Sequence, residues 1–82
     1  MFEMPVEVDA RNLLCPLPVI RTQDAVAGLP AGTEVVVRCT DPGALLDIPA
    51  WCRINGHELL SAREIDGEVE VRLRTVAQPP AA

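Results

Sequence analysis

The dipeptide Asp66-Gly67 constrains the fold of this chain more than any other feature. It separates residues 57–65 from residues 68–75, and Asp-Gly between two such runs is typical of a two-residue β-hairpin turn. In the second run, apolar residues alternate with charged ones, which predicts a strand buried on one face. These apolar residues are Val69, Val71 and Leu73. We therefore expect a terminal antiparallel hairpin whose apolar face is covered by helices.

The segments before the hairpin alternate between strand and helix patterns. In order, they predict a strand at 5–8, a helix from Pro16 to about Gly28, a strand at 33–40 and a helix at 41–56. In the second helix, Asp41 suits the N-cap and Gly56 suits the position just past the C-terminus. Pro49 removes an internal hydrogen-bond donor, so we expect this helix to kink or split near residues 47–49.

Together these elements predict an α/β (α+β) two-layer sandwich in the order β-α-β-α-β-β. Two helices would cover one face of a four-stranded mixed sheet. The domain is expected to span residues 1–75, and residues 76–82, which show no pattern, are expected to form a disordered tail. A chain of 82 residues can bury roughly 60–65% of its unfolded surface, so it needs no disulfide or metal ion for folding.

Composition and charge exclude several classes of function. The net charge of −5 repels nucleic-acid phosphates, and the two aromatic residues, Phe2 and Trp51, provide no stacking platform. The first ten residues contain no Lys or Arg and do not resemble a signal peptide. The longest apolar run, residues 13–20, is too short to span a membrane and contains two prolines. We therefore expect a soluble cytoplasmic protein that binds neither nucleic acid nor membranes.

Cys15 precedes Pro16 at the expected start of the first helix. If Pro16 is the first helical residue, Cys15 is the N-cap, and its sulfur faces unpaired backbone N–H groups. Such a position lowers a cysteine pKa from about 8.5 to roughly 3.5–7.5, and Pro18 would stiffen the same turn. The alternative is that Cys15 is a small buried apolar side chain and that Pro16 is an ordinary helix start.

The remaining polar and sulfur-containing residues suggest structural roles. Cys39 and Cys52 fall on apolar faces and are expected in the core, and His57 is expected at a helix-strand junction. A Cys₃His zinc site is disfavoured because the chain has no closely spaced cysteine pair. Asp41 and Asp47 are interpreted as caps for the two parts of the kinked helix. We expect a solvated acidic face formed by Glu58, Glu64, Glu68 and Glu70. The alternative is that these residues help to select basic partners.

Two segments resemble the TusA/SirA-type sulfur-carrier family. "VDARNLLCPLPVIRTQDAV" is similar to its pattern of Asp, Gly three residues later, and CPxP opening the first helix, and "DPGALLDIPAWCRINGHELL" continues the likeness. The resemblance implies that Cys15 accepts a sulfane sulfur as a persulfide from a cysteine desulfurase or a rhodanese-like protein. It then passes this sulfur to a downstream acceptor protein, as a carrier without a cofactor rather than a turnover enzyme. Family members serve tRNA thiolation, molybdenum-cofactor metabolism and sulfur oxidation.

The resemblance also defines an expected docking surface around the cysteine. Arg11, Asn12, Leu13 and Leu14 would face the partner protein. The alternative is that one of the two leucines packs beneath the first helix. Asn12 replaces the family's glycine, and we expect it to adopt a positive φ, which Asn tolerates. We take the chain to be a monomer.

Two other functions remain open at this point. One is a thiol redox or regulatory module in which Cys15 pairs with Cys39 or with a cysteine of a partner. The other is a nucleic-acid-binding module, suggested only by analogy of fold.

Overall fold

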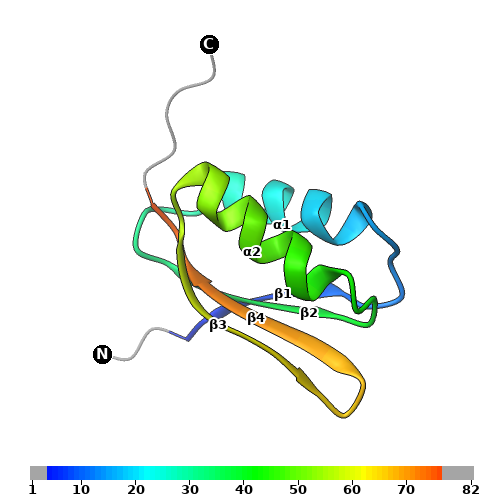
Figure 1. Ribbon diagram of the computed structural model, residues 1–82. Helices are drawn as coiled ribbons and strands as arrows, with labels where there is room; N and C mark the ends of the chain where they lie inside the picture. Colours follow the sequence, from blue (N-terminus) through cyan, green and yellow to red (C-terminus); the bar gives the residue numbers. More distant parts are fainter. Residues whose placement is uncertain (1–3, 77–82) are drawn as a thin grey trace.

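The computed structural model describes residues 4–76 (Figure 1). Its elements are β1 (Val6–Ala10), α1 (Leu17–Ala27), β2 (Glu34–Cys39), α2 (Ala44–Asn55), β3 (Glu58–Ile65) and β4 (Glu68–Arg74). The predicted order β-α-β-α-β-β is confirmed. Neither described helix has the length and apolar character needed to cross a membrane.

The four strands form one mixed sheet in the order β1-β2-β4-β3. β1 and β2 are parallel, whereas β4 runs antiparallel to both of its neighbours. Both helices lie on the same face of this sheet, and no element of residues 4–76 covers the other face (Figure 1). The predicted two-layer sandwich is therefore confirmed.

The core lies between the sheet and the two helices. Alternating residues of β4, Val69, Val71 and Leu73, are at most 1% exposed, as the sequence pattern predicts. Helix α2 contributes Ile48 and Cys52, which are both fully buried. The β-branched residues of the central strands fill this layer well, since they pack favourably on a pleated surface.

The hairpin turn has the predicted geometry. Asp66 has φ 50° and Gly67 has φ 81°, so both residues adopt the left-handed conformation of a type I′ turn. This turn fixes the pairing of Ile65 with Glu68. A bulge between Leu59 and Ser61 shifts the register further along β3, a feature that the sequence pattern does not predict.

Helix α2 differs from expectation at its start and at its proline. The helix begins at Ala44, after a turn formed by residues 41–43, so Asp41 is not its N-cap. The helix continues through Pro49 without splitting. One missing donor is tolerated here because Ile48 and Cys52, on either side of Pro49, are held against the sheet.

The C-terminal end of α2 is as predicted. Gly56 has φ 77°, and the backbone N–H of His57 donates to the carbonyl of Cys52 at 2.9 Å, which closes the helix. The N–H of Val76, the first residue of the predicted tail, donates to Nδ1 of His57 at 3.1 Å. Residues 77–82 lie outside the described residues.

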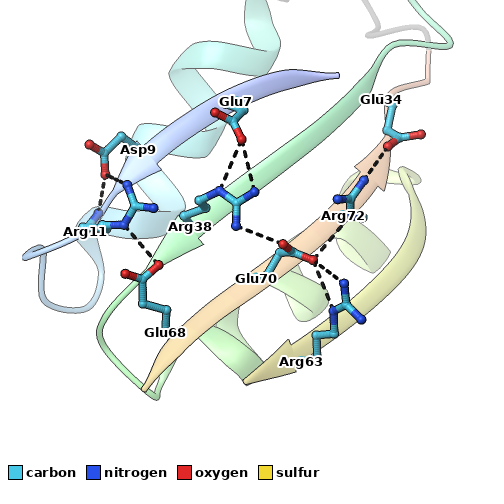
Figure 2. A network of polar contacts seen from close by, with 9 residues as sticks. All are labelled: Glu7, Asp9, Arg11, Glu34, Arg38, Arg63, Glu68, Glu70 and Arg72. Carbon is cyan, nitrogen blue, oxygen red and sulfur yellow. Dashed lines mark hydrogen bonds and ion pairs between the residues drawn. The ribbon is translucent and has the colours of Figure 1, made fainter. Parts of the chain in front are cut away.

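The open face of the sheet carries a network of arginines and carboxylates (Figure 2). At its centre, the Glu70 side chain is only 8% exposed and contacts three guanidinium groups. These belong to Arg38 at 2.9 Å, Arg63 at 3.0 Å and Arg72 at 3.3 Å. The expectation that Glu70 belongs to a solvated face is wrong, because these arginines cover its carboxylate. Of the other acidic residues, Glu58 and Glu68 pair with Arg74 and Arg11, and Glu64 is exposed.

We expect this network to make the fold sensitive to acid. Hydrogen bonds from Arg63, and then from Arg72 and Arg38, lower the pKa of Glu70 below its ordinary value of 4.5. Because the pKa of Glu70 is lower in the folded state, its ionised carboxylate stabilises the fold at pH values above its unfolded-state pKa. This stabilisation is lost as the pH falls through the folded-state pKa. Urea unfolding between pH 7 and pH 3 should therefore show a weaker pH dependence for Glu70→Gln than for the wild type. Glu64→Gln is the control, and an unchanged dependence in Glu70→Gln would contradict this account.

Candidate functional site

The candidate site lies at one edge of the sheet, where two loops meet. The cysteine loop, residues 11–16, joins β1 to α1, and residues 40–43 join β2 to α2. Because β1 and β2 are parallel and directly paired, both loops leave their strands at the same edge. The carboxyl ends of parallel strands are the usual position of functional groups in α/β proteins.

Two consecutive residues after β2 hold the cysteine loop. Thr40 Oγ1 accepts a hydrogen bond from the N–H of Asn12 at 2.8 Å, and Asp41 Oδ2 accepts one from the N–H of Cys15 at 2.9 Å. Asp41 Oδ1 also accepts from the N–H of Gly43 at 3.1 Å. Asp41 thus links the cysteine loop to the start of α2. Thr40 was not predicted, and Asp41 was interpreted as a cap. The hydrogen bonds of both residues to the cysteine loop depend on how β1 and β2 pair, which the sequence pattern does not show.

Asn12 adopts the positive φ that was predicted for it. Its φ of 62° places it in the left-handed region, which Asn tolerates better than most residues other than Gly. The replacement of the family's glycine is therefore compatible with the bend of the cysteine loop.

Cys15 is exposed, but it is not the N-cap of α1. Helix α1 begins at Leu17 with Pro16 as its cap, and the carbonyl of Pro16 accepts the helical hydrogen bond from Ile20 at 3.2 Å. Pro18 lies in the first turn and is buried. The prediction that Cys15 caps the helix is wrong by one residue, because the turn that precedes α1 is closed by Leu17 N–H and Leu14 carbonyl at 2.8 Å.

The charges near the sulfur are opposite to those expected. The Asp47 carboxylate is the main cause that raises the pKa of the Cys15 thiol above 9.0, and desolvation and the negative charge of Asp41 act in the same direction. The predicted lowering of this pKa is wrong, because the carboxylates of Asp47 and Asp41 oppose ionisation of the thiol. Asp47 is also not a cap, since it lies in the first turn of α2.

The two leucines of the cysteine loop have different environments. Leu13 packs against the core, whereas Leu14 is 73% exposed. Sequence reasoning left open which leucine would be buried. Leu17 and Leu46, near Cys15 and Asp47 in the chain, are also exposed, at 48% and 76%. We call Leu14, Leu17 and Leu46 the apolar rim. The exposure of Leu17 and Leu46 was not predicted, because it depends on which face of each helix packs against the sheet.

Arg11 belongs to the open face of the sheet as much as to the cysteine loop. Its side chain pairs with Glu68 at 3.1 Å and with Asp9 at 3.5 Å (Figure 2). Its guanidinium group is thus already neutralised within the chain.

The other candidate ligands and thiols are structural. Cys39 and Cys52 are fully buried, as predicted, and burial raises the pKa of each thiol to about 11. His57 is 5% exposed and stacks on Trp51 with ring centroids 4.9 Å apart, and burial lowers its pKa. Within residues 4–76, no three His, Cys, Asp or Glu side chains are arranged to hold a metal ion.

Removing the Asp41 carboxylate should loosen the cysteine loop. In Asp41→Ala, the N–H groups of Cys15 and Gly43 lose their acceptor, and we expect a loss of about 1–3 kcal/mol in the free energy of unfolding. The amide of Cys15 should also exchange its hydrogen faster in NMR measurements. Asp24→Ala, at an exposed position of α1, is the control. Equal exchange rates in both variants would contradict the role of Asp41.

Cys15 is thus an exposed thiol on a loop that is anchored at one edge of the two-layer sandwich. A family model described as Sulfurtransferase TusA matches residues 6–75, and the chain belongs to this family.

Known proteins of similar sequence and structure agree with this assignment. Sulfur carrier protein TusA of Pseudomonas syringae is 43% identical over 61 residues, covering 74% of this chain and 73% of the relative. A putative sulfur carrier protein of Bacillus subtilis, YrkF, is 35% identical over 84% of this chain, which spans only 37% of that relative. A SirA-like protein from Desulfitobacterium hafniense has a TM-score of 0.77 at 28% identity, covering 88% of this chain and 99% of that structure.

Proposed function

We propose that this chain is a sulfur carrier and that Cys15 holds the transferred sulfur as a persulfide. The observation that carries the proposal is the contrast between the three thiols. Cys15 is exposed on an anchored loop, whereas Cys39 and Cys52 are buried. A donor protein therefore has access to one sulfur among the three.

The chemistry resembles thiol-disulfide exchange. The Cys15 thiolate attacks the outer sulfur of a donor persulfide, a new S–S bond forms, and the donor leaves as a thiolate that takes up a proton. In the second step, an acceptor thiolate attacks the outer sulfur of Cys15–S–SH, and Cys15 leaves as the thiolate. The two steps move one sulfur atom between proteins without an external oxidant or reductant.

The donor is proposed to be a cysteine desulfurase or a rhodanese-like protein, and the acceptor a protein that supplies tRNA thiolation, molybdenum-cofactor metabolism or sulfur oxidation. The apolar rim and the cysteine loop, residues 11–16, would form the docking surface. Leu14 is well suited to this role because it exposes apolar area beside the sulfur. A reducing compartment, the cytoplasm, would keep Cys15 free for transfer.

The experiment that tests this function is sulfur loading of the purified chain. After incubation with a cysteine desulfurase and cysteine, the intact mass should increase by one sulfur atom, and a thiol reductant should remove it. A chain that gains no sulfur under conditions in which the desulfurase forms its own persulfide would contradict the proposal.

A further inference from the structure

We infer that Thr40 and Asp41 are positioning residues that hold the Cys15 sulfur in place for both steps of sulfur transfer, and that this restraint sets the transfer rate. The inference deepens the proposed function and rests on it, because it names the side chains that present the carrier thiol to the donor and the acceptor. Both residues act through the backbone of the cysteine loop and take no part in the exchange of sulfur.

The cysteine loop is held at two points by consecutive residues of another segment. Near the start of the loop, the N–H of Asn12 donates to Thr40 Oγ1 at 2.8 Å. Near its end, the N–H of Cys15 donates to Asp41 Oδ2 at 2.9 Å. Both distances are those of well-formed hydrogen bonds. The part of the loop that leads to the sulfur is therefore fastened at both ends to one short piece of chain.

The two acceptors are themselves fixed by the fold. Thr40 directly follows the end of β2, where the fully buried Cys39 pairs with Ala10 of β1. The carboxylate of Asp41 is oriented by a second contact, because its Oδ1 accepts from the N–H of Gly43 at 3.1 Å. The sheet therefore sets the position of the first anchor, and the turn before α2 sets that of the second.

The cysteine loop needs these anchors because its reactive end is exposed. Cys15 is exposed and Leu14 is 73% exposed, so the position of the thiol depends on the backbone that carries it. The bend at Asn12 has a φ of 62°, which is less favourable for Asn than a right-handed conformation. The hydrogen bond to Thr40 stabilises this bend.

A fixed thiol favours transfer between two proteins. In each step, one sulfur attacks another as an existing bond to sulfur breaks, so the reacting atoms must be aligned. A loop that is already ordered reaches this alignment without a further loss of entropy in the complex. Loosening the loop should therefore slow transfer within the complex. Docking should be largely retained, since Leu17 and Leu46 of the apolar rim lie on the helices.

The rate of sulfur loading from a cysteine desulfurase and cysteine, measured by intact mass at several concentrations of the chain, tests this inference. Thr40→Val replaces the hydroxyl by a methyl group, and we expect kcat to fall by about tenfold with KM nearly unchanged. Thr40→Ser keeps the hydroxyl and should retain the kcat of the wild type. Thr33→Val is the matched control, because Thr33 precedes β2 and its hydroxyl donates to the carbonyl of Pro30 at 2.7 Å.

Asp41 is tested by a graded pair of variants. Asp41→Ala removes both acceptor oxygens and should lower kcat further than Asp41→Asn, which keeps one oxygen for the two N–H groups. Hydrogen exchange measured by NMR reports on the first anchor without any sulfur chemistry. The amide of Asn12 should exchange faster in Thr40→Val than in Thr33→Val. If Thr40→Val does not fold, Thr40→Ala provides the same comparison.

A Thr40→Val variant with the kcat of the wild type would overturn the inference. A rise in KM with unchanged kcat would also overturn it, because Thr40 would then be a docking contact. An equal fall of kcat in Thr33→Val would do the same, since it would indicate a general loosening of the fold. These outcomes all require a wild type that loads sulfur. A wild type that takes none from a loaded desulfurase would instead reject the proposed function, and with it this role.

Discussion

The Cys15→Ser variant is expected to gain no sulfur when it is incubated with a cysteine desulfurase and cysteine, while the wild type gains one atom. A serine hydroxyl cannot form the S–S bond of a persulfide, and the two remaining thiols are buried with pKa values raised to about 11. Because Cys15 is exposed, the substitution should change the free energy of unfolding by less than about 0.5 kcal/mol. Intact mass and urea unfolding measure the two effects.

Cys52→Ala is the matched control for this experiment. It removes a thiol of the same chain from the core and should leave sulfur loading intact, since Cys52 is fully buried. Full loading of Cys15→Ser, or loss of loading in Cys52→Ala with the fold retained, would reject Cys15 as the carrier.

Ile48→Ala is expected to lower the free energy of unfolding by about 2–5 kcal/mol. Ile48 is fully buried, and its truncation leaves a cavity between α2 and the sheet that the surrounding side chains fill only in part. Domains of this size have a total stability of about 5–15 kcal/mol, so the loss is large. Urea unfolding followed by circular dichroism measures it.

Ile54→Ala provides the comparison within the same helix. Ile54 is 83% exposed, and the same substitution there should change stability by about 0.5 kcal/mol or less. Equal losses in the two variants would mean that α2 does not pack against the sheet through Ile48.

The fold could be predicted from the sequence because its signals are local. Asp66 and Gly67 determine the turn through their own φ angles, and the alternation in β4 determines which face is buried. Gly56 likewise ends α2 by adopting a left-handed conformation. The continuity of α2 through Pro49 could not be predicted in this way, because it depends on packing of the helix against the sheet.

The site was predicted less completely because its electrostatics are not local. The position of Cys15 beside a helix start suggested a favoured thiolate, but the decisive charges belong to Asp41 and Asp47 in another segment. Asp41 contacts the backbone of Cys15 because β1 and β2 pair in parallel and bring the two following loops together. An Asp near the start of a helix otherwise suggests a cap, so the pattern alone could not distinguish the two roles.

The most direct measurement of the central claim is tandem mass spectrometry of the sulfur-loaded wild-type chain. We predict that the added sulfur lies on the peptide that contains Cys15, and that the peptides containing Cys39 and Cys52 keep their unmodified masses. Added sulfur on either buried cysteine, with Cys15 unmodified, would contradict it.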